Sequence, residues 1–422
     1  MKFLKILFFI PFIVLSHADD MYLIKGGITF LPNGDFVKKD ILIDEGQIIL
    51  VEDEIDDVGA ENIINAEGKY VTPGLVVFST LGLLEIGSLS QTNDASSNIY
   101  NAGFDPSKSF NPFSQAIRLN RSKGVSSTIL VPQASGYFSG LFSYTKINGG
   151  LKQEKKGPLA LLTSFGESYN DSRSAELNFV LDLFNLIRNR PSEKWTYETD
   201  NIQFFFGSQN DYKFTSRDLR AIELVLNKSI PLVVKVKKAT DIITILEMAD
   251  TEKIDLILWG ANEAHMVADR IAESGIRVVL DPLDNIPDSF DSLNSTYENA
   301  IRLDEAGVNM AFYYAQGAGS HNAYLAAQSA GNAVAMGLDY RKALKAITYN
   351  PAQFFGLENI GLIAPGFDGD IVVWDNDPLE LMTNVEKVII GGEIQDLSNR
   401  QDELTERYIK EKDKPNSYRS RK

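Results

Sequence analysis

Three residues with side chains suited to proton or carbonyl chemistry follow short apolar or glycine-rich runs in the sequence. Lys235 and Asp281 each end an apolar run, and His321 follows Gly317–Ser320. A lysine at the end of a buried strand is partly desolvated, which lowers its pKa and favours the neutral amine that forms a Schiff base. Aspartate and histidine can act as general acids or bases. Lys235, Asp281 and His321 are therefore the candidate catalytic residues.

Other chemistries have less support in the sequence. Ser79 and Thr80 end an apolar run, but a hydroxyl nucleophile needs a base, and only the distant His321 is available. Neither a G-x-S-x-G sequence nor a phosphate-binding loop is present. Carboxylates such as Glu85 and Asp94 could hold a hard ion, Mg²⁺ or Ca²⁺. The lack of cysteine excludes disulfides, zinc–thiolate sites and thiol nucleophiles.

The elements that must position these residues begin at Pro73, where short apolar runs start to alternate with amphipathic segments. Strands are predicted near 75–79, 125–131, 158–163, 202–206, 231–236, 255–259, 276–281 and 308–314. Helices are predicted near 110–123, 174–189, 215–227, 239–250, 262–274, 294–306 and 322–337, and Leu338–Leu357 predicts a further helix followed by a loop around Asn350-Pro351. Eight strands with helices between them favour an α/β fold, a (β/α)8 TIM-like barrel with its site at the carboxyl ends of the strands. Alternation over Ser135–Asn148 predicts an inserted hairpin.

The two ends of the chain have a different pattern. Residues 21–66 and 361–395 contain short strands separated by turn signals, and we expect them to share one small sheet. The predicted domains are a composite β domain from 21–70 and 360–395, a barrel from 71–359 and a charged tail from 396–422. Thr72-Pro73-Gly74 predicts a turn at the first boundary.

The first 18 residues have the pattern of a signal peptide: two lysines, an apolar centre and Ser16-His17-Ala18 as a cleavage site. The sequence therefore predicts an exported protein, periplasmic or secreted, without a membrane span after cleavage. Removal of Lys2 and Lys5 changes the formal net charge from −16 to −18. A protein this acidic repels nucleic acid and anionic membranes.

Four motifs carry a family resemblance. They are the strand entry Pro73-Gly74-Leu75, the sequence Gly124-Val125-Ser126-Ser127, the sequence Ala346-Ile347-Thr348-Tyr349-Asn350-Pro351-Ala352, and the long segment Ile360–Trp374, which contains Pro365-Gly366-Phe367-Asp368-Gly369-Asp370. Together they resemble the amidohydrolase superfamily, and its imidazolonepropionase-like branch most closely. The resemblance implies a barrel with a small sheet domain, a divalent metal such as zinc, and hydrolysis of amide and related C–N bonds.

The metal ligands that the resemblance implies are missing. Its two first-strand histidine positions hold Ser79 and Leu81, its strand-five and strand-six positions hold Lys235 and Trp259, and its aspartate position holds Ala315. The chain has three histidines, at 17, 265 and 321, and the first leaves with the signal peptide. Two histidines cannot fill four positions, so we expect no metal cofactor.

Three hypotheses follow from this conflict. The leading one is a degenerate homologue that binds a small-molecule ligand or an active paralogue, as a homo- or hetero-oligomer. Its pocket is expected at the former ligand positions, Ser79, Leu81, Trp259 and Ala315. The second is a working hydrolase with a non-standard site made of Lys235, Asp281 and His321. The third is a scaffold subunit whose barrel mouth is filled. Lys235 has a structural alternative as well, an ammonium paired with a carboxylate such as Asp281 or Glu85.

Overall fold

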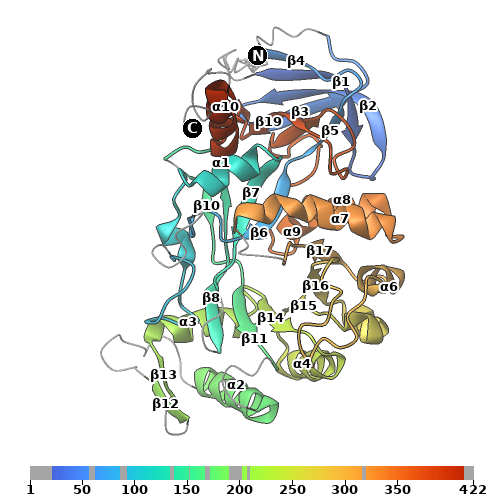
Figure 1. The fold of residues 1–422 in the computed structure, drawn as a ribbon. Helices are drawn as coiled ribbons and strands as arrows, with labels where there is room; N and C mark the ends of the chain where they lie inside the picture. Colours follow the sequence, from blue (N-terminus) through green and yellow to red (C-terminus); the bar gives the residue numbers. More distant parts are fainter. Residues whose placement is uncertain are drawn as a thin grey trace, which may run out of the picture.

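The computed structural model describes residues 21–56, 62–85, 93–133, 137–151, 153–166, 172–189, 202–206, 210–315 and 320–412. The predicted signal peptide and residues 413–422 of the predicted tail lie outside these ranges. Within them, no helix combines the length and the apolar character needed to cross a bilayer. Figure 1 shows a twisted sheet at one end of the molecule and the helix α2 with the β12–β13 pair at the other.

The sheet at one end combines strands from both ends of the chain, in the order β20-β19-β18-β5-β1-β2-β3, with β4 paired to β1. Its strands are β1 (Tyr22–Phe30), β2 (Phe36–Asp44), β3 (Gln47–Glu52), β4 (Asn62–Asn65), β5 (Tyr70–Pro73), β18 (Ile371–Trp374), β19 (Val385–Ile390) and β20 (Glu393–Ile394). The antiparallel pairing of β5 with β18 joins the two sets. Gly74 then connects β5 directly to β6, so the turn predicted at Thr72-Pro73-Gly74 is replaced by a passage from one sheet to the next.

Seven of the eight predicted barrel strands are found as strands with parallel neighbours. They are β6 (Leu75–Ser79), β7 (Val125–Leu130), β11 (Leu161–Ser164), β14 (Leu232–Val236), β15 (Leu256–Gly260), β16 (Arg277–Leu280) and β17 (Met310–Phe312). The pair β6–β7 belongs to one sheet, and β11-β14-β15-β16-β17 to another. These strands are apolar and bounded by polar turns, which is why the sequence predicts them well.

The prediction of a barrel strand at 202–206 was wrong. β12 (Ile202–Phe206) pairs antiparallel with β13 (Asn210–Phe214) in a separate two-stranded sheet. The run Ile202–Phe206 has the apolar composition of a buried strand, but a partner only a few residues away can pair with it through a short connection. Parallel pairing would instead require a long crossover.

The prediction of an inserted hairpin was also wrong in its pairing. β8 (Phe138–Leu141) and β9 (Ser143–Lys146) are separated by Phe142 alone, which is too short a connection to reverse the chain. Instead β9 pairs antiparallel with β7 and with β10 (Lys155–Lys156), while β8 pairs antiparallel with β11. One bent segment therefore links the two sheets.

The strands do not form the continuous ladder of eight parallel strands that the sequence predicts. Among the described residues, β17 and β6 share no ladder pairing, and the segment Ala346–Ile347 lies between them. The amide of Phe312 donates to the carbonyl of Ala346 at 2.8 Å, and the amide of Val76 donates to the carbonyl of Ile347 at 3.0 Å. The described residues thus form a mixed α/β fold, and they do not show the ladder pairing between β17 and β6 that would close a (β/α)8 barrel.

The helices agree with the predicted amphipathic segments but are mostly shorter. They are α1 (Gln115–Arg121), α2 (Arg173–Arg188), α3 (Ser216–Leu226), α4 (Ala239–Glu252), α5 (Ala268–Ser274), α6 (Asn299–Glu305), α7 (Ala326–Ala335), α8 (Tyr340–Lys345), α9 (Tyr349–Gln353) and α10 (Arg400–Lys412), with short 3₁₀ helices η2 (Pro106–Ser109), η4 (Ala264–Val267) and η5 (Ser320–Leu325). Reciprocal hydrogen bonds between Thr215 and Asp218 begin α3 as a capping box.

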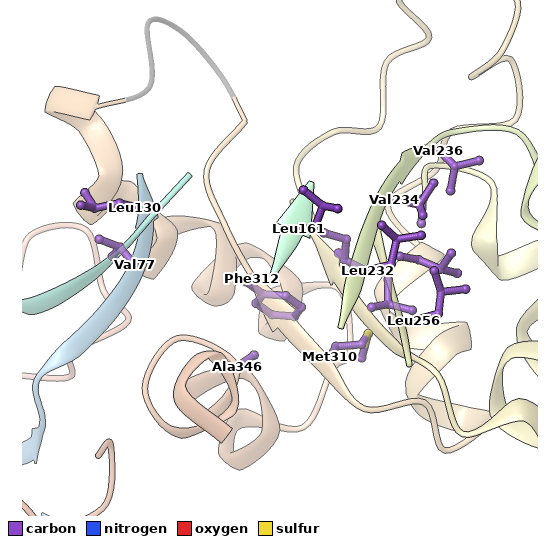
Figure 2. Packing of buried hydrophobic residues seen from close by; sticks show 14 of the residues in the cluster. Val77, Leu130, Leu161, Leu232, Val234, Val236, Leu256, Met310, Phe312 and Ala346 are labelled. Carbon is purple, nitrogen blue, oxygen red and sulfur yellow. The ribbon is translucent and has the colours of Figure 1, made fainter. Parts of the chain in front are cut away.

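The parallel strands bury a different set of side chains on each face. Leu232, Val234 and Val236 of β14 pack with residues of the helices, and Figure 2 shows them with other members of this helix-facing cluster, including Leu256 and Phe312. The alternate residues form an interior cluster that draws on most of the strands and on the segment after α9: Val76, Phe78, Ile129, Phe142, Tyr144, Leu162, Val233, Ile257, Trp259, Val279, Ala311, Phe354 and Phe355. The side-chain period of two fixes which residues can reach a site at the strand ends.

Candidate functional site

A cavity of about 650 Å³ lies where β14, β15 and β17 end. Its lining includes Lys235 from β14, Trp259 from β15, Asn262 just after β15, Asp284 after β16, and Tyr313 and Ala315 after β17. This is the carboxyl end of the parallel strands, where α/β folds bind their ligands. The volume falls within the range of about 300–1,000 Å³ that is usual for small-molecule sites.

Aromatic rings fill the interior beside this cavity. The centroid of Trp259 lies 4.5 Å from that of Tyr313, 5.1 Å from that of Phe78 and 5.9 Å from that of Phe142. Phe355 adds a further ring, 5.7 Å from Phe142. Trp259 is 6% exposed. The space between the strands is therefore occupied by packed rings, and one edge of this packing reaches the cavity.

Ser79 and Leu81 take part in local packing and do not line the cavity. The Ser79 hydroxyl lies 2.7 Å from that of Thr128 and accepts a hydrogen bond from the amide of Leu81. Leu81 is fully buried in the helix-facing cluster, whereas Val76 and Phe78 are β6 side chains of the interior cluster. Of the five positions that correspond to metal ligands, the structure brings together Lys235, Trp259 and Ala315.

Asp281 holds the backbone beside the cavity. Its carboxylate accepts hydrogen bonds from the amides of Ala315 at 2.8 Å and Leu283 at 3.0 Å, and from the Ser329 hydroxyl at 2.9 Å. Burial raises the pKa of Asp281, and these three donors oppose the rise. Asp281 therefore connects the end of β16 to Ala315 and to α7.

The remaining candidates lie apart from the lining of the cavity. His321 is in η5, and its carbonyl accepts a hydrogen bond from the Asn120 side chain at 3.1 Å. Glu85 accepts one from the side chain of Asn111, and Asp94 is exposed. Asp281 and His321 form these hydrogen bonds with residues that are not catalytic candidates. A shared catalytic role of Lys235, Asp281 and His321 stays a prediction.

The residues at the ligand positions do not fit a metal ion. A hydroxyl, a leucine, an ammonium, an indole and a methyl group offer no set of imidazole and carboxylate donors. Over the ranges that the structure describes, no three His, Asp or Glu side chains lie together as a metal-binding group.

The cavity also contains residues that the sequence did not single out, among them Asn262, Asp284 and Tyr313. Gly260 and Ala261 both have positive φ, 83° and 46°, and this turn places Asn262 at the cavity. A glycine directly after a strand is a signal of such a turn, but the direction of the following side chains cannot be read from it. Tyr313 could have been found, because it is two residues from Ala311 on the interior face of β17.

Comparison with known proteins relates the chain to hydrolases. The sequence model of the amidohydrolase family matches residues 215–395. The structure is similar to that of an amidohydrolase from Thermotoga maritima MSB8, with a TM-score of 0.76 and 27% identity, over 88% of this chain and 99% of that one.

Two curated relatives are also similar to this chain, one over most of its length and one over a short segment. Amidohydrolase tasK of Hapsidospora irregularis is 24% identical over 404 residues, which are 84% of this chain and 40% of the relative. Adenine deaminase 1 of Carboxydothermus hydrogenoformans is 43% identical over 61 residues, 14% of this chain and 10% of the relative. The chain therefore spans well under half the length of these curated relatives.

Proposed function

The chain belongs to the amidohydrolase superfamily, and from that premise we propose that it is a metal-free member that binds a small ligand at the ends of its strands. The observation that carries the proposal is Trp259. This ring stands at the strand-six ligand position and packs against Tyr313 and Phe78. An indole at this position contributes no metal ligand and fills the space that an ion and its bound water would need.

The cavity beside Trp259 favours ligand binding over a scaffold role. A subunit that only supported a partner would have no need of a cavity of about 650 Å³ with lysine, asparagine and aspartate side chains in its wall. Packed aromatic rings fill the interior between the strands, and the cavity lies beside this packing.

A non-standard hydrolase remains the second candidate. Lys235 on the cavity wall is its strongest element. Asp281 contributes less, because its carboxylate already accepts three hydrogen bonds. Under this alternative, alanine at Lys235, Asp281 or His321 abolishes a measured turnover.

Export and assembly complete the proposal. The N-terminal sequence favours export to the periplasm or the medium, and the acidic charge of the chain disfavours nucleic acid as a partner. We propose that the ligand-bound chain acts as a homo-oligomer or beside an active paralogue, as the resemblance implies.

The test is the metal content of the purified full chain. The protein is dialysed against zinc, manganese and magnesium in turn, passed through a desalting column and measured by elemental mass spectrometry. We expect far less than one equivalent of each metal, because the ligand positions hold no imidazole.

The Trp259→His variant provides a matched control, because one imidazole alone should still retain far less than one equivalent of metal. A full equivalent in the unsubstituted chain would refute the proposal. Hydrolysis of cyclic amides and dipeptides would then be the next assay.

A further inference from the structure

The strongest sign of a specific ligand is the Asn262 side chain. Asn262 is 3% exposed and lines the cavity. Its Nδ2 donates to the carbonyl of Asp284 at 3.3 Å, which fixes the orientation of the amide. Its Oδ1 is buried and has no hydrogen-bond partner among the described residues. A buried acceptor without a donor costs about 1–3 kcal/mol, so a ligand that supplies the donor is favoured.

The backbone before Asn262 supports this interpretation. Ala261 has a φ of 46°, in the left-handed region that costs free energy for a residue with a Cβ. Ala261 is fully buried, and its carbonyl accepts a hydrogen bond from the Asn299 side chain at 3.0 Å. The neighbouring structure therefore holds this strained turn in place, and the turn directs Asn262 to the cavity.

The charged groups of the lining are balanced. Lys235 and Lys237 contribute two positive charges, and Asp284 and Asp288 contribute two negative ones. Lys237 and Asp288 form an ion pair at 2.9 Å. A lining with both signs and no net charge suits a ligand that also carries both signs better than a strong anion or a strong cation.

We propose that the cavity binds a small zwitterion of the free amino-acid type; this inference rests on the proposed ligand-binding function. The ammonium of the ligand donates to Asn262 Oδ1 and lies near the Asp284 carboxylate. The carboxylate of the ligand faces the Lys235 ammonium, in a charge-assisted contact. An apolar or aromatic side chain of the ligand lies against Trp259 and Tyr313, whose ring faces also attract an ammonium.

The test uses four matched probes, titrated into the full chain by calorimetry. L-Phenylalanine carries both charges, N-acetyl-L-phenylalanine lacks the ammonium, L-phenylalaninamide lacks the carboxylate, and 3-phenylpropionate lacks the amino group entirely. We expect L-phenylalanine to bind, and each of the other three to bind at least about tenfold more weakly, because each lacks one of the two charges that the proposed contacts use.

Variants assign the two ends of the zwitterion. Asn262→Ala should weaken L-phenylalanine and L-phenylalaninamide but leave N-acetyl-L-phenylalanine nearly unchanged. Lys235→Met should weaken L-phenylalanine and N-acetyl-L-phenylalanine but leave the amide nearly unchanged. Asn332→Ala is the matched control, because Asn332 donates to the carbonyl of Gln328 in α7 and does not line the cavity.

Two outcomes overturn the inference. If a probe that lacks one charge binds as tightly as L-phenylalanine or more tightly, that charge is not required for binding. If no probe binds at millimolar concentration, the ligand is not of the free amino-acid type. These results are separable from the failure of the proposed function. A metal-free chain that binds a singly charged probe keeps that function, whereas a stoichiometric metal refutes it whatever the probes do.

Discussion

At the scale of single residues, Trp259 packs in the interior at a position where the family resemblance implies a metal ligand. Its ring contributes buried apolar area to the interior cluster and contacts the rings of Phe78, Phe142 and Tyr313. Aromatic pairs of this kind add stability beyond the area that they bury. The position thus contributes to folding where the superfamily resemblance implies catalysis.

We predict that Trp259→Ala lowers the free energy of unfolding by about 3–5 kcal/mol, because it leaves a cavity among packed rings. The measurement is urea denaturation without added ligand. Phe290→Ala is the control, since Phe290 is 87% exposed and its loss should change stability by less than about 0.5 kcal/mol. Equal effects of the two substitutions would contradict the packing role of Trp259.

Asp281 makes stability depend on pH. Burial raises its pKa above the ordinary value of 3.8, so the folded chain keeps this proton to a higher pH than the unfolded chain does. Between the two pKa values the folded state binds more protons, and its stability falls as the pH rises. This contribution is fully favourable below the unfolded pKa and is lost as the pH passes the folded pKa.

The Asp281→Asn variant should lack this dependence. As the pH is raised from about 4 to 7, the unsubstituted chain should lose stability relative to the variant. The check is the difference between their free energies of unfolding in urea, measured at several pH values. A difference that stays constant over this interval would show that Asp281 has the same proton affinity in both states.

At the scale of elements, one buried ion-pair cluster connects β9 to the terminal sheet. Lys146 Nζ lies 2.8 Å from Asp368 and 3.2 Å from Asp370, and Asp370 also accepts from the amide of Gly391. Burial raises the pKa of Asp370, and the positive charge of Lys146 opposes the rise. Trp374 adds a second connection, since its indole donates to the Thr72 hydroxyl at 2.8 Å.

We predict that Lys146→Met destabilises the fold by about 3–5 kcal/mol, because it leaves the carboxylate of Asp370 buried without its cation. Thermal and urea unfolding would measure the loss. The surface pair of Lys342 and Asp304 offers the control, since the Lys342 side chain is 57% exposed and Lys342→Met should cost no more than about 1 kcal/mol. A loss no larger than that of the control would contradict the stabilising role of the cluster.

The elements also show how far the sequence predicts this structure. The strands Leu232–Val236 and Leu256–Gly260 were predicted correctly, because an apolar run this short between polar turns is typical of a buried strand and too short for a helix. Ile202–Phe206 has the same composition but pairs with β13, because pairing depends on which partner is near and not on composition alone. Lys235 and Trp259 were placed by their distance from strand ends, whereas the position of Asn262 depends on the left-handed turn before it.

At the scale of the whole molecule, the strands that end at the cavity are enclosed by helices, and a sheet made from both ends of the chain lies at one end of the fold (Figure 1). Close contacts secure this arrangement. A Cβ on Gly124 would come within 2.6 Å of the Trp374 ring, and one on Gly74 within 2.3 Å of Ser126. Residues of the motifs that carry the family resemblance, Gly74, Gly124 and Trp374, therefore make contacts that join the sheet to the strands.

The pairing of β5 with β18 has a consequence for biosynthesis. Tyr70 faces Trp374 in this ladder, so the two partners leave the ribosome about 300 residues apart. Until β18 emerges, the nascent chain displays β5 with one edge unpaired, and closing so large a loop carries an entropic cost. The N-terminal sheet is therefore completed only after β18 has been made, although its first strands are made first.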